Sequence, residues 1–204
     1  PDYTIETDGE LRLAGNASDP NTGCGDVPTS SWDLDLDGSF DDAFGPGAVV
    51  PWANLPAALQ NAPRGEPQTI RMQVTDTSGE AAIYETTVTI YERDPVAVAD
   101  FNPRPEPACN QQVDLLGGGS FHPNPNREIV QWDWDIGDDG SVERANENDT
   151  FTFDAFGTYT VRLTVTDDLG RSNATTMQIP VLAGNNRPVA QSLVAVYDVN
   201  EGDP

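Results

Sequence analysis

Apolar and polar residues alternate along several short stretches of the chain. In residues 159–166 an aromatic or aliphatic residue stands at every odd position, with threonine or arginine between. A period of two places all the apolar side chains of a strand on one face, so the pattern predicts antiparallel strands with one buried face. The side chains expected on the buried faces are Leu11, Leu13, Ile70, Met72, Val74, Val88, Ile90, Val113, Leu115, Tyr159, Val161, Leu163, Val165, Met177 and Ile179.

Turn-forming residues separate these stretches. They occur at residues 19–21 (Asp-Pro-Asn), 78–79 (Ser-Gly), 123–125 (Pro-Asn-Pro) and 169–170 (Leu-Gly). One helical turn is expected at residues 55–60. Many short strands with frequent turns predict an all-β fold built from antiparallel sandwiches.

A Trp-Asp block occurs twice in the chain. Residues 32–39 align without a gap on residues 134–141, and residues 74–79 align in the same order on residues 165–170. Two blocks in one order indicate two copies of one module whose loops differ in length. Pro-Val-Ala at residues 95–97 recurs at residues 188–190, so we place the modules at 1–94 and 95–184, and a linker with the start of a third module at 185–204.

These motifs resemble the PKD (polycystic kidney disease) domain family, which has an immunoglobulin-like β-sandwich fold. The second copy carries the family's marks at residues 115–120, 134–138 and 157–161, and the first copy at residues 13–20 and 32–35. The first copy departs from the family at Gln68, where the family has tyrosine, and in an insert around residues 51–64. The resemblance implies tandem immunoglobulin-like sandwiches that act as non-catalytic modules of cell-surface proteins, adhesins, surface-layer proteins or secreted hydrolases.

Charge narrows the range of partners. The chain has 34 acidic and 10 basic residues, a net charge of −24, and every basic residue is arginine. Such a chain repels the phosphates of nucleic acids and anionic membranes, and it attracts divalent cations. The alternative is an adaptation for solubility, from a salty or GC-rich source. No apolar run approaches the ~18 residues of a membrane span, and Pro1 stands where a methionine would begin a gene product. We therefore interpret the chain as a piece of a longer secreted protein, extracellular or at the cell surface.

The acidic run at residues 33–37 is the first candidate for chemistry. Asp33, Asp35 and Asp37 alternate with leucines. In an extended strand Trp32 and both leucines would face the core, and the carboxylates would share the other face about 6.6 Å apart, too far for one ion. If the chain instead curls before Gly38, the Asp-x-Asp-x-Asp-Gly pattern can wrap Ca²⁺ with oxygen ligands.

The residues after this run complete the candidate set. Asp41 falls at position nine of a calcium loop, and Phe44 stands at position twelve, where an EF-hand has a bidentate glutamate. The missing ligand would come from Asp42, a backbone carbonyl or water. The candidate calcium ligands are Asp33, Asp35, Asp37, Asp41 and Asp42. The alternative is a solvated strand face followed by a polar turn.

The second copy has a weaker form of the same pattern. A glycine replaces the middle carboxylate, which leaves Asp135, Asp138 and Asp139 as candidate ligands. Asp76 and Asp167 close the two Val-Thr-Asp blocks, and we interpret them as turn residues.

Cys24 and Cys109 do not occupy equivalent positions. Cys24 follows the second expected strand of the first copy, whereas Cys109 precedes the corresponding strand of the second. In an immunoglobulin-like topology these positions lie at opposite ends of a sandwich, which points Cys109 toward a third module. We expect each cysteine to pair with a neighbouring module; a Cys24–Cys109 bond or two free thiols are the alternatives. Any disulfide implies an oxidising compartment.

Two functions compete on this basis. The first is a structural or adhesive surface protein whose sandwiches set spacing and whose partners are neighbouring modules, copies of itself, surface proteins or polysaccharide. The second is an accessory module that holds a secreted hydrolase near a polysaccharide or protein, with Trp52 as its exposed aromatic. Trp132 shares a strand face with Trp134 and is expected in the core. His122, the only histidine, is expected in a surface loop, and without a second histidine or a positioned nucleophile there is no catalytic triad.

Overall fold

The computed structural model of the chain describes residues 2–184 except residues 19–24, 26 and 105. Nearly all of its regular structure is β-strand, and the strands surround two separate apolar cores. The expected start of a third module falls outside the described residues, as does Cys24. In the described part of the chain no helix is long and apolar enough to cross a membrane.

The first unit packs a five-stranded sheet against a two-stranded one. The larger sheet has the order β1 (Tyr3–Glu6), β7 (Ala81–Tyr91), β6 (Pro67–Thr75), β3 (Thr29–Asp33) and β4 (Ala43–Phe44), with β1 parallel to β7 and the other pairs antiparallel. The smaller sheet pairs β2 (Glu10–Arg12) with β5 (Val49–Pro51). A 3₁₀ turn η2 (Trp52–Asn54) and a short helix α1 (Ala57–Gln60) follow, which confirms the helical turn expected there.

The second unit packs two three-stranded sheets. One has the order β10 (Ile129–Ile136), β12 (Gly157–Asp167) and β13 (Ser172–Val181), and the other β11 (Asn148–Thr152), β9 (Gln112–Leu116) and β8 (Asp100–Asn102). All of these pairs are antiparallel. Three strands facing three in this order is the arrangement of an immunoglobulin-like sandwich.

The alternating apolar residues fill the two cores as predicted. Trp32 in β3 and Trp134 in β10 are almost fully buried, and each indole Nε1 donates to a loop carbonyl, of Gly45 and Asn146 respectively, at 3.0 Å. The amphipathic ring therefore buries its area without leaving its N–H unpaired. Most of the other predicted side chains are buried; Val74, Tyr159 and Met177 pack against the cores while partly exposed.

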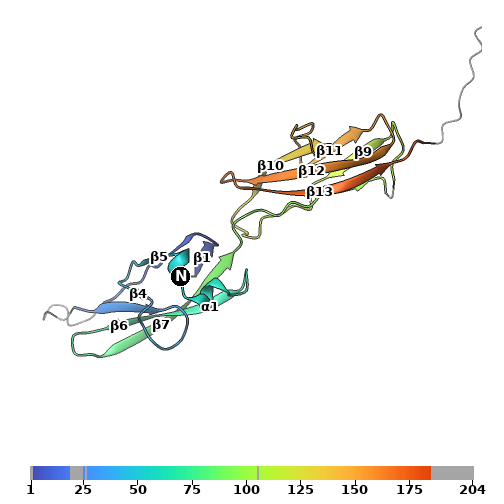
Figure 1. Cartoon of the computed structure of the whole chain (residues 1–204). Coiled ribbons are helices and arrows are strands. Elements are labelled where there is room, and N and C mark those ends of the chain that lie inside the picture. The colour runs from blue at the N-terminus through green and yellow to red at the C-terminus, as the bar shows by residue number, and fades with distance from the viewer. Residues whose placement is uncertain (1, 19–24, 26, 105, 185–204) are drawn as a thin grey trace, which may run out of the picture.

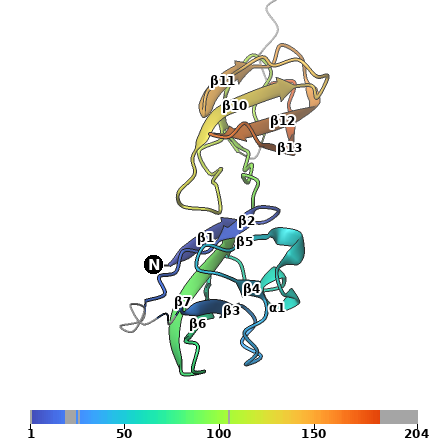
Figure 2. The same ribbon diagram turned by 90° about the vertical axis from the view of Figure 1, so that its left-hand side faces the viewer.

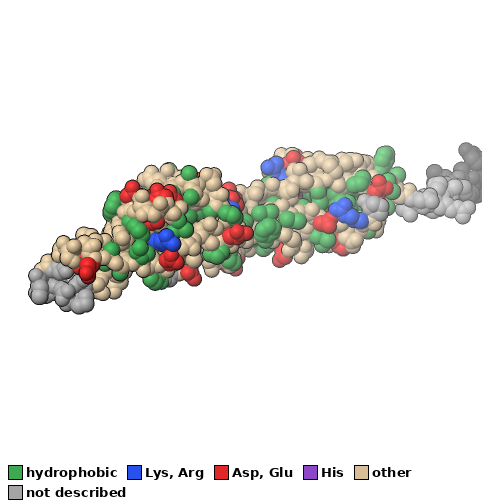
Figure 3. Space-filling view, turned by 90° about the horizontal axis from the view of Figure 1, so that it is seen from below, with side chains coloured by type: hydrophobic (Ala, Val, Ile, Leu, Met, Phe, Trp, Pro, Cys, Tyr) green, Lys and Arg blue, Asp and Glu red, His purple; other side chains and the backbone are tan. Residues whose placement is uncertain are grey.

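The two sandwiches follow one another along the chain, end to end, with a short linker between them (Figures 1 and 2). The space-filling view shows an elongated outline in which acidic side chains are spread over the visible face of both units (Figure 3). Two kinds of place on this outline carry unusual chemistry: the acidic turns after β3 and β10, and the joint.

Candidate functional site

The acidic turn after β3 brings three carboxylates together. The strand ends at Asp33, and the chain then reverses through Leu36 (φ 61°) and Gly38 (φ 91°). As a result, ligand oxygens of Asp33, Asp35 and Asp37 lie within 4.8 Å of one another. Of the two alternatives for this run, the curled conformation is the one found. The left-handed turn at Leu36 ends the extended run, and the Leu36 side chain is 42% exposed.

Asp33 is the buried member of this group. The residue is fully buried, and its Oδ2 accepts a hydrogen bond from Gly38 N at 3.2 Å. Its Oδ1 is buried as well and has no hydrogen-bond partner. An ionised oxygen shielded from water and unpaired is unfavourable, and a bound cation would remove this cost.

Asp35 and Asp37 shape the turn while offering oxygens to solvent. Asp35 Oδ1 accepts from Asp37 N at 3.2 Å, and Asp37 Oδ1 accepts from Ser39 N at 2.7 Å. Both residues are exposed, so a cation could reach them without rearrangement of the core. Three carboxylates of this kind are hard oxygen donors that suit Ca²⁺.

The two remaining candidates of the first turn play different parts. Asp42 Oδ2 accepts from Leu34 N at 2.6 Å, which ties the two arms of the turn together. Burial, together with the negative charges of Asp35, Asp41 and Asp33, raises the pKa of Asp42. Asp41 is exposed and lies outside the group of three.

The turn after β10 has a similar backbone but different contacts. Asp138 (φ 54°) and Gly140 (φ 94°) repeat the left-handed positions of the first turn. Asp135 accepts from Asp139 N at 3.0 Å and from Gly140 N at 2.8 Å, so both of its oxygens are paired. Asp138 Oδ1 lies 3.1 Å from Arg162 NH1. Among the described residues, Asp135, Asp138 and Asp139 do not form a group of ligand atoms as tight as that of the first turn.

Glu143 is a residue of this second turn that the sequence analysis missed. Its Oε2 accepts from Ile136 N at 2.7 Å, the part that Asp42 plays toward Leu34 in the first turn. The blocks align at one fixed offset only up to residue 141, and a shift of one position in the following loop hides the correspondence of Glu143 with Asp42.

A polar network joins the two sandwiches, with Glu6 at its centre. Glu6 is the last residue of β1 and belongs to the first unit. Its Oε2 lies 2.7 Å from Arg171 NH2, and its Oε1 lies 3.3 Å from Arg127 Nε. Asn124 Nδ2 also donates to Glu6 Oε1, at 2.8 Å. The three charged side chains are only 15–17% exposed, so water screens these contacts weakly.

Asp167, in the second sandwich, holds Arg171 in place. Its Oδ2 accepts from Arg171 Nε at 3.0 Å, and its Oδ1 accepts from the backbone N–H groups of Leu169 and Arg171. Burial by itself raises the pKa of Asp167, but these hydrogen bonds and the Arg171 guanidinium outweigh it, so the pKa is lowered. Asp167 is thus the turn residue that was predicted, and it also anchors the joint.

His122 lies in a loop, as predicted, but its side chain is buried at this joint and not exposed on the surface. Its side chain has no exposed area. The ring Nε2 lies 3.1 Å from the carbonyl oxygen of Arg93 in the linker, and Nδ1 accepts from Asn124 N at 3.0 Å. The loop that carries His122 packs against the linker, and this contact with residues distant in sequence removes the ring from water.

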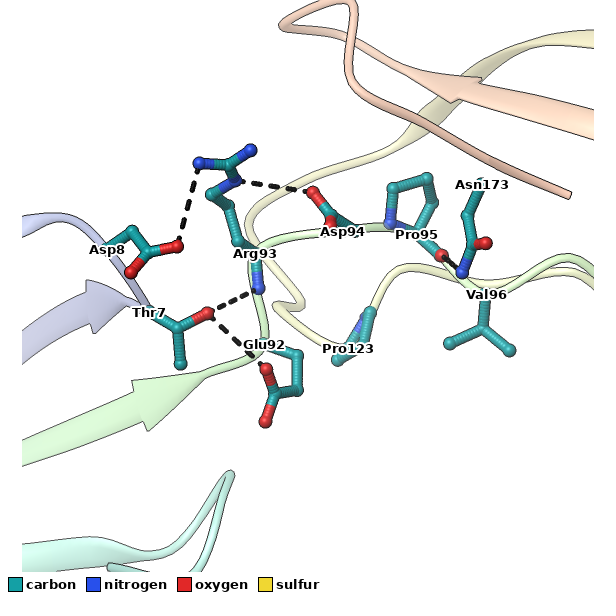
Figure 4. Close-up of a pocket in the computed structure, with 9 residues that line it drawn as sticks. All are labelled: Thr7, Asp8, Glu92, Arg93, Asp94, Pro95, Val96, Pro123 and Asn173. Atoms are coloured by element: carbon teal, nitrogen blue, oxygen red, sulfur yellow. Dashed lines mark hydrogen bonds and ion pairs between the residues drawn. The ribbon is translucent and has the colours of Figure 1, made fainter. Parts of the chain in front are cut away.

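The linker is itself tied to both units (Figure 4). Arg93 N donates to Thr7 Oγ1 at 3.2 Å, and its guanidinium lies 3.8 Å from Asp8 Oδ2. On the other side Asn173 Nδ2 donates to the carbonyl oxygen of Pro95 at 2.9 Å. Two features therefore restrain the linker: its contacts with each sandwich, and a proline, which limits the backbone conformation.

Cys109 lies at the end of the second sandwich that is remote from the joint, as its topological position suggested. Its N–H donates to the Leu182 carbonyl beyond the end of β13, whereas Asn173, near the start of β13, contacts the linker. Its Sγ lies 3.1 Å from the carbonyl oxygen of Asp154. Cys109 is a free thiol in the described part of the chain. Its pairing with a neighbouring module stays a prediction, and Cys24 lies outside the described residues.

Trp52 offers little open ring for stacking on a sugar. It packs against the first core while partly buried, and the guanidinium carbon of Arg64 lies 5.5 Å from its ring centroid. The accessory-module alternative named Trp52 as its exposed aromatic, and a tryptophan packed in this way gives it little support; the alternative stays a prediction. Trp132 packs against the second core, as predicted.

Both units are all-β sandwiches of immunoglobulin-like class, which confirms the predicted fold class. Residues 92–181 match the model of the PKD domain family, and this part of the chain is a PKD domain. PKD and immunoglobulin-like domains are generally non-catalytic modules.

Over 164 residues the chain is 32% identical to the Dyslexia-associated protein KIAA0319 homolog of Rattus norvegicus. That alignment covers 77% of this chain, and the chain spans only 14% of the length of that relative.

Two solved structures illustrate the likeness of a single sandwich. The PKD1 domain of Vibrio anguillarum Epp is 28% identical with a TM-score of 0.37, over 45% of this chain and 98% of that one. The PKD1 domain of the Vibrio cholerae metalloprotease PrtV is 30% identical with a TM-score of 0.34, over 43% of this chain and 98% of that one.

Proposed function

We propose that the chain is a structural spacer of an extracellular or cell-surface protein, in which two PKD-type sandwiches form one stiff segment. PKD domains are typically extracellular or cell-surface modules. The hypothesis that the first sandwich is also of PKD type is supported by the repeated Trp-Asp and Val-Thr-Asp blocks and by the equivalent burial of Trp32 and Trp134. The observation that carries the proposal is the joint, where Glu6 of one sandwich is held between two arginines of the next.

The joint resists bending because its charged groups are shielded and complementary. Separating the sandwiches would leave Glu6 without Arg127, Arg171 and Asn124, and would break all three contacts of this partly shielded cluster at once. Contacts of the linker with both units add further restraint. A spacer of this kind sets the distance between whatever lies before and after it.

Small-angle X-ray scattering of the whole chain tests the spacer. We expect the profile to fit one extended arrangement of the sandwiches, and Glu6→Gln to broaden the range of arrangements. Glu10→Gln is the matched control, because Glu10 is an exposed glutamate of β2 whose ion pair with Arg12 is local. A wild-type chain that already requires a broad ensemble would contradict the proposal.

We also propose that the turn after β3 binds Ca²⁺ through Asp33, Asp35 and Asp37. Two independent observations support this site: three ligand oxygens within 4.8 Å, and the buried Oδ1 of Asp33 that has no partner. Binding would neutralise like charges and fix the turn at the end of β3, and would thereby stiffen the first sandwich.

Calorimetric unfolding with calcium and with a chelator tests the site. We expect calcium to raise the melting temperature of the first sandwich by the amount set by affinity and ion concentration. The rise should disappear in Asp33→Asn and in Asp35→Asn; the second variant alters an exposed residue and guards against a folding defect. Asp76→Asn, in a turn outside the group, should keep it. A chain that melts at the same temperature in both conditions would mean that the turn is a solvated polar surface.

A further inference from the structure

Each acidic turn faces an arginine on the neighbouring strand. In the first sandwich Arg71 of β6 is the Cα partner of Asp33, and in the second Arg162 of β12 is the Cα partner of Asp135. A guanidinium is long enough to enter a turn beside its partner residue. Whether it does so decides if the turn is open to another cation.

The two arginines point in different directions. Arg71 Nε lies 2.8 Å from Glu85 Oε1, so β7 draws this guanidinium away from the turn. Arg162 NH1 instead lies 3.1 Å from Asp138 Oδ1, inside its own acidic turn. Arg162 lines the same surface hollow as Asp135 and Asp138.

The strand beyond each arginine explains this difference. The Cα partner of Arg71 on β7 is Glu85, whereas the Cα partner of Arg162 on β13 is Thr176. Thr176 is uncharged, so in the second sandwich the aspartates of the turn are the available anions. A cross-strand pair of opposite charge is a weak but directional contact, sufficient to choose between two orientations of an arginine.

The buried aspartates reflect the same choice. Asp135, beside the inward Arg162, has both oxygens satisfied by the backbone N–H groups of Asp139 and Gly140. Asp33, beside the outward Arg71, keeps a buried Oδ1 without a partner. The first turn thus has a buried carboxylate oxygen that no cation pairs with, whereas in the second turn the guanidinium of Arg162 supplies the positive charge.

We propose that the cross-strand partner of this arginine selects the cation of each turn. Glu85 holds Arg71 away from Asp33 and leaves the first turn open to a divalent metal. Thr176 lets Arg162 occupy the second turn as an internal counter-ion, which keeps calcium out by like-charge repulsion. This inference rests on the proposed calcium site, and it assigns to Glu85 the role of a positioning residue that touches no metal.

Calcium titration of the whole chain by isothermal calorimetry tests the first turn. Glu85→Thr, which copies the second sandwich, should release Arg71 and weaken binding by on the order of fivefold, the range of an exposed charge pair. Adding Arg71→Gln to that variant should restore binding to at least the wild-type affinity, which a merely structural role of Glu85 would not produce. Glu66→Thr, an exposed glutamate ahead of β6, controls for the loss of one negative charge.

The number of calcium ions bound per chain tests whether Arg162 keeps calcium out of the second turn. The wild-type chain should bind one calcium ion that Asp135→Asn leaves in place. A second ion, lost in Asp135→Asn, would overturn the role of Arg162.

The remaining outcomes separate the two proposals. In one outcome, Asp33→Asn and Asp35→Asn abolish calcium binding, but Glu85→Thr binds calcium as tightly as Glu66→Thr does. This outcome would overturn the role of Glu85 and preserve the calcium site. A wild-type chain that binds no calcium would overturn both.

Discussion

At the scale of single residues, Gly117 shows how closely the chain packs above the tryptophan of the second core. A methyl group added there would lie 2.5 Å from the carbonyl oxygen of Glu147 and 3.1 Å from the Trp134 ring. The corresponding Gly15 of the first unit would press on the flexible end of Met72, at 2.3 Å from its sulfur. A backbone carbonyl moves less readily than the end of a methionine side chain. The two positions should therefore differ in how well they tolerate an added methyl group.

We therefore expect Gly117→Ala to reduce the stability of the chain by roughly 2 kcal/mol, a typical cost of overpacking, and Gly15→Ala to reduce it less. Thermal or denaturant unfolding measures both. Gly47→Ala is the control, because no atom lies within 4 Å of its added methyl group and its φ is not positive. Equal losses for all three would indicate that the site above Trp134 relaxes freely.

Asp167 predicts how the joint responds to acid. Its pKa is lowered in the folded chain, so its carboxylate contributes stability that is complete above its ordinary pKa of about 3.9 and is lost as the pH falls through the lower folded value. Asp167→Asn should cost roughly 2 kcal/mol at pH 7, because it removes a charge-assisted hydrogen bond of Arg171, whose other carboxylate partner, Glu6, remains.

The difference between wild type and Asp167→Asn should then shrink as the pH falls below about 4. Denaturant unfolding at a series of pH values measures it. Asp168→Asn, which removes the more exposed ion pair of Arg127, should cost less. A difference that stays constant down to pH 2 would show that the carboxylate charge contributes nothing.

At the scale of elements, the turn after β3 carries a leucine in a left-handed conformation. Leu36 has φ 61° and is 42% exposed, so it combines backbone strain with little burial. A non-glycine residue in this region costs of order 1 kcal/mol, and asparagine adopts it more readily.

Leu36→Asn should stabilise the first sandwich by about 0.5–1 kcal/mol, as measured by the shift of its melting temperature. Leu169→Asn is the control: Leu169 is an exposed leucine of a turn whose φ is negative, and the change should bring no gain. Destabilisation by Leu36→Asn would mean that the half-covered leucine contributes more than the strain costs.

The strands were predictable from the sequence, whereas for the turn after β3 the sequence left two conformations open. Alternation placed Ile70, Val161 and their neighbours on buried faces, because a period of two leaves only one arrangement that covers the apolar side chains. The same alternation of Asp and Leu after Trp32 also suggests an extended strand. The left-handed step at Leu36 breaks that strand, and no rule of composition assigns this conformation to leucine.

The joint was also hidden from sequence reasoning. Glu6, Arg127 and Arg171 are far apart along the chain, and each alone looks like an ordinary surface charge. Only the end-to-end placement of the sandwiches brings them together. For the same reason His122 looked exposed. The different orientations of Arg71 and Arg162 were hidden as well. The two arginines occupy equivalent positions in the same register, and only the pairing of the strands shows that Glu85 faces one and Thr176 the other.

At the scale of the whole molecule, two cores and one joint make the chain a pair of coupled folding units. Each sandwich has its own buried apolar cluster and can unfold by itself, but unfolding of either one breaks the contacts of Glu6 with the second unit. The sandwich that melts first therefore loses the joint, and the other then melts without it.

This order of events makes a directional prediction for Glu6→Gln in a calorimetric scan. The lower of the two transitions should fall by roughly 4–8 °C for each kcal/mol that the joint contributes, since each unit has about 90 residues. The upper transition should not move, because the joint is already broken when it occurs. Glu10→Gln should change neither. Were Glu6→Gln to lower the upper transition as well, or that transition alone, the effect of the side chain would not depend on the joint, and the stiffness of the spacer would have to come from the linker instead.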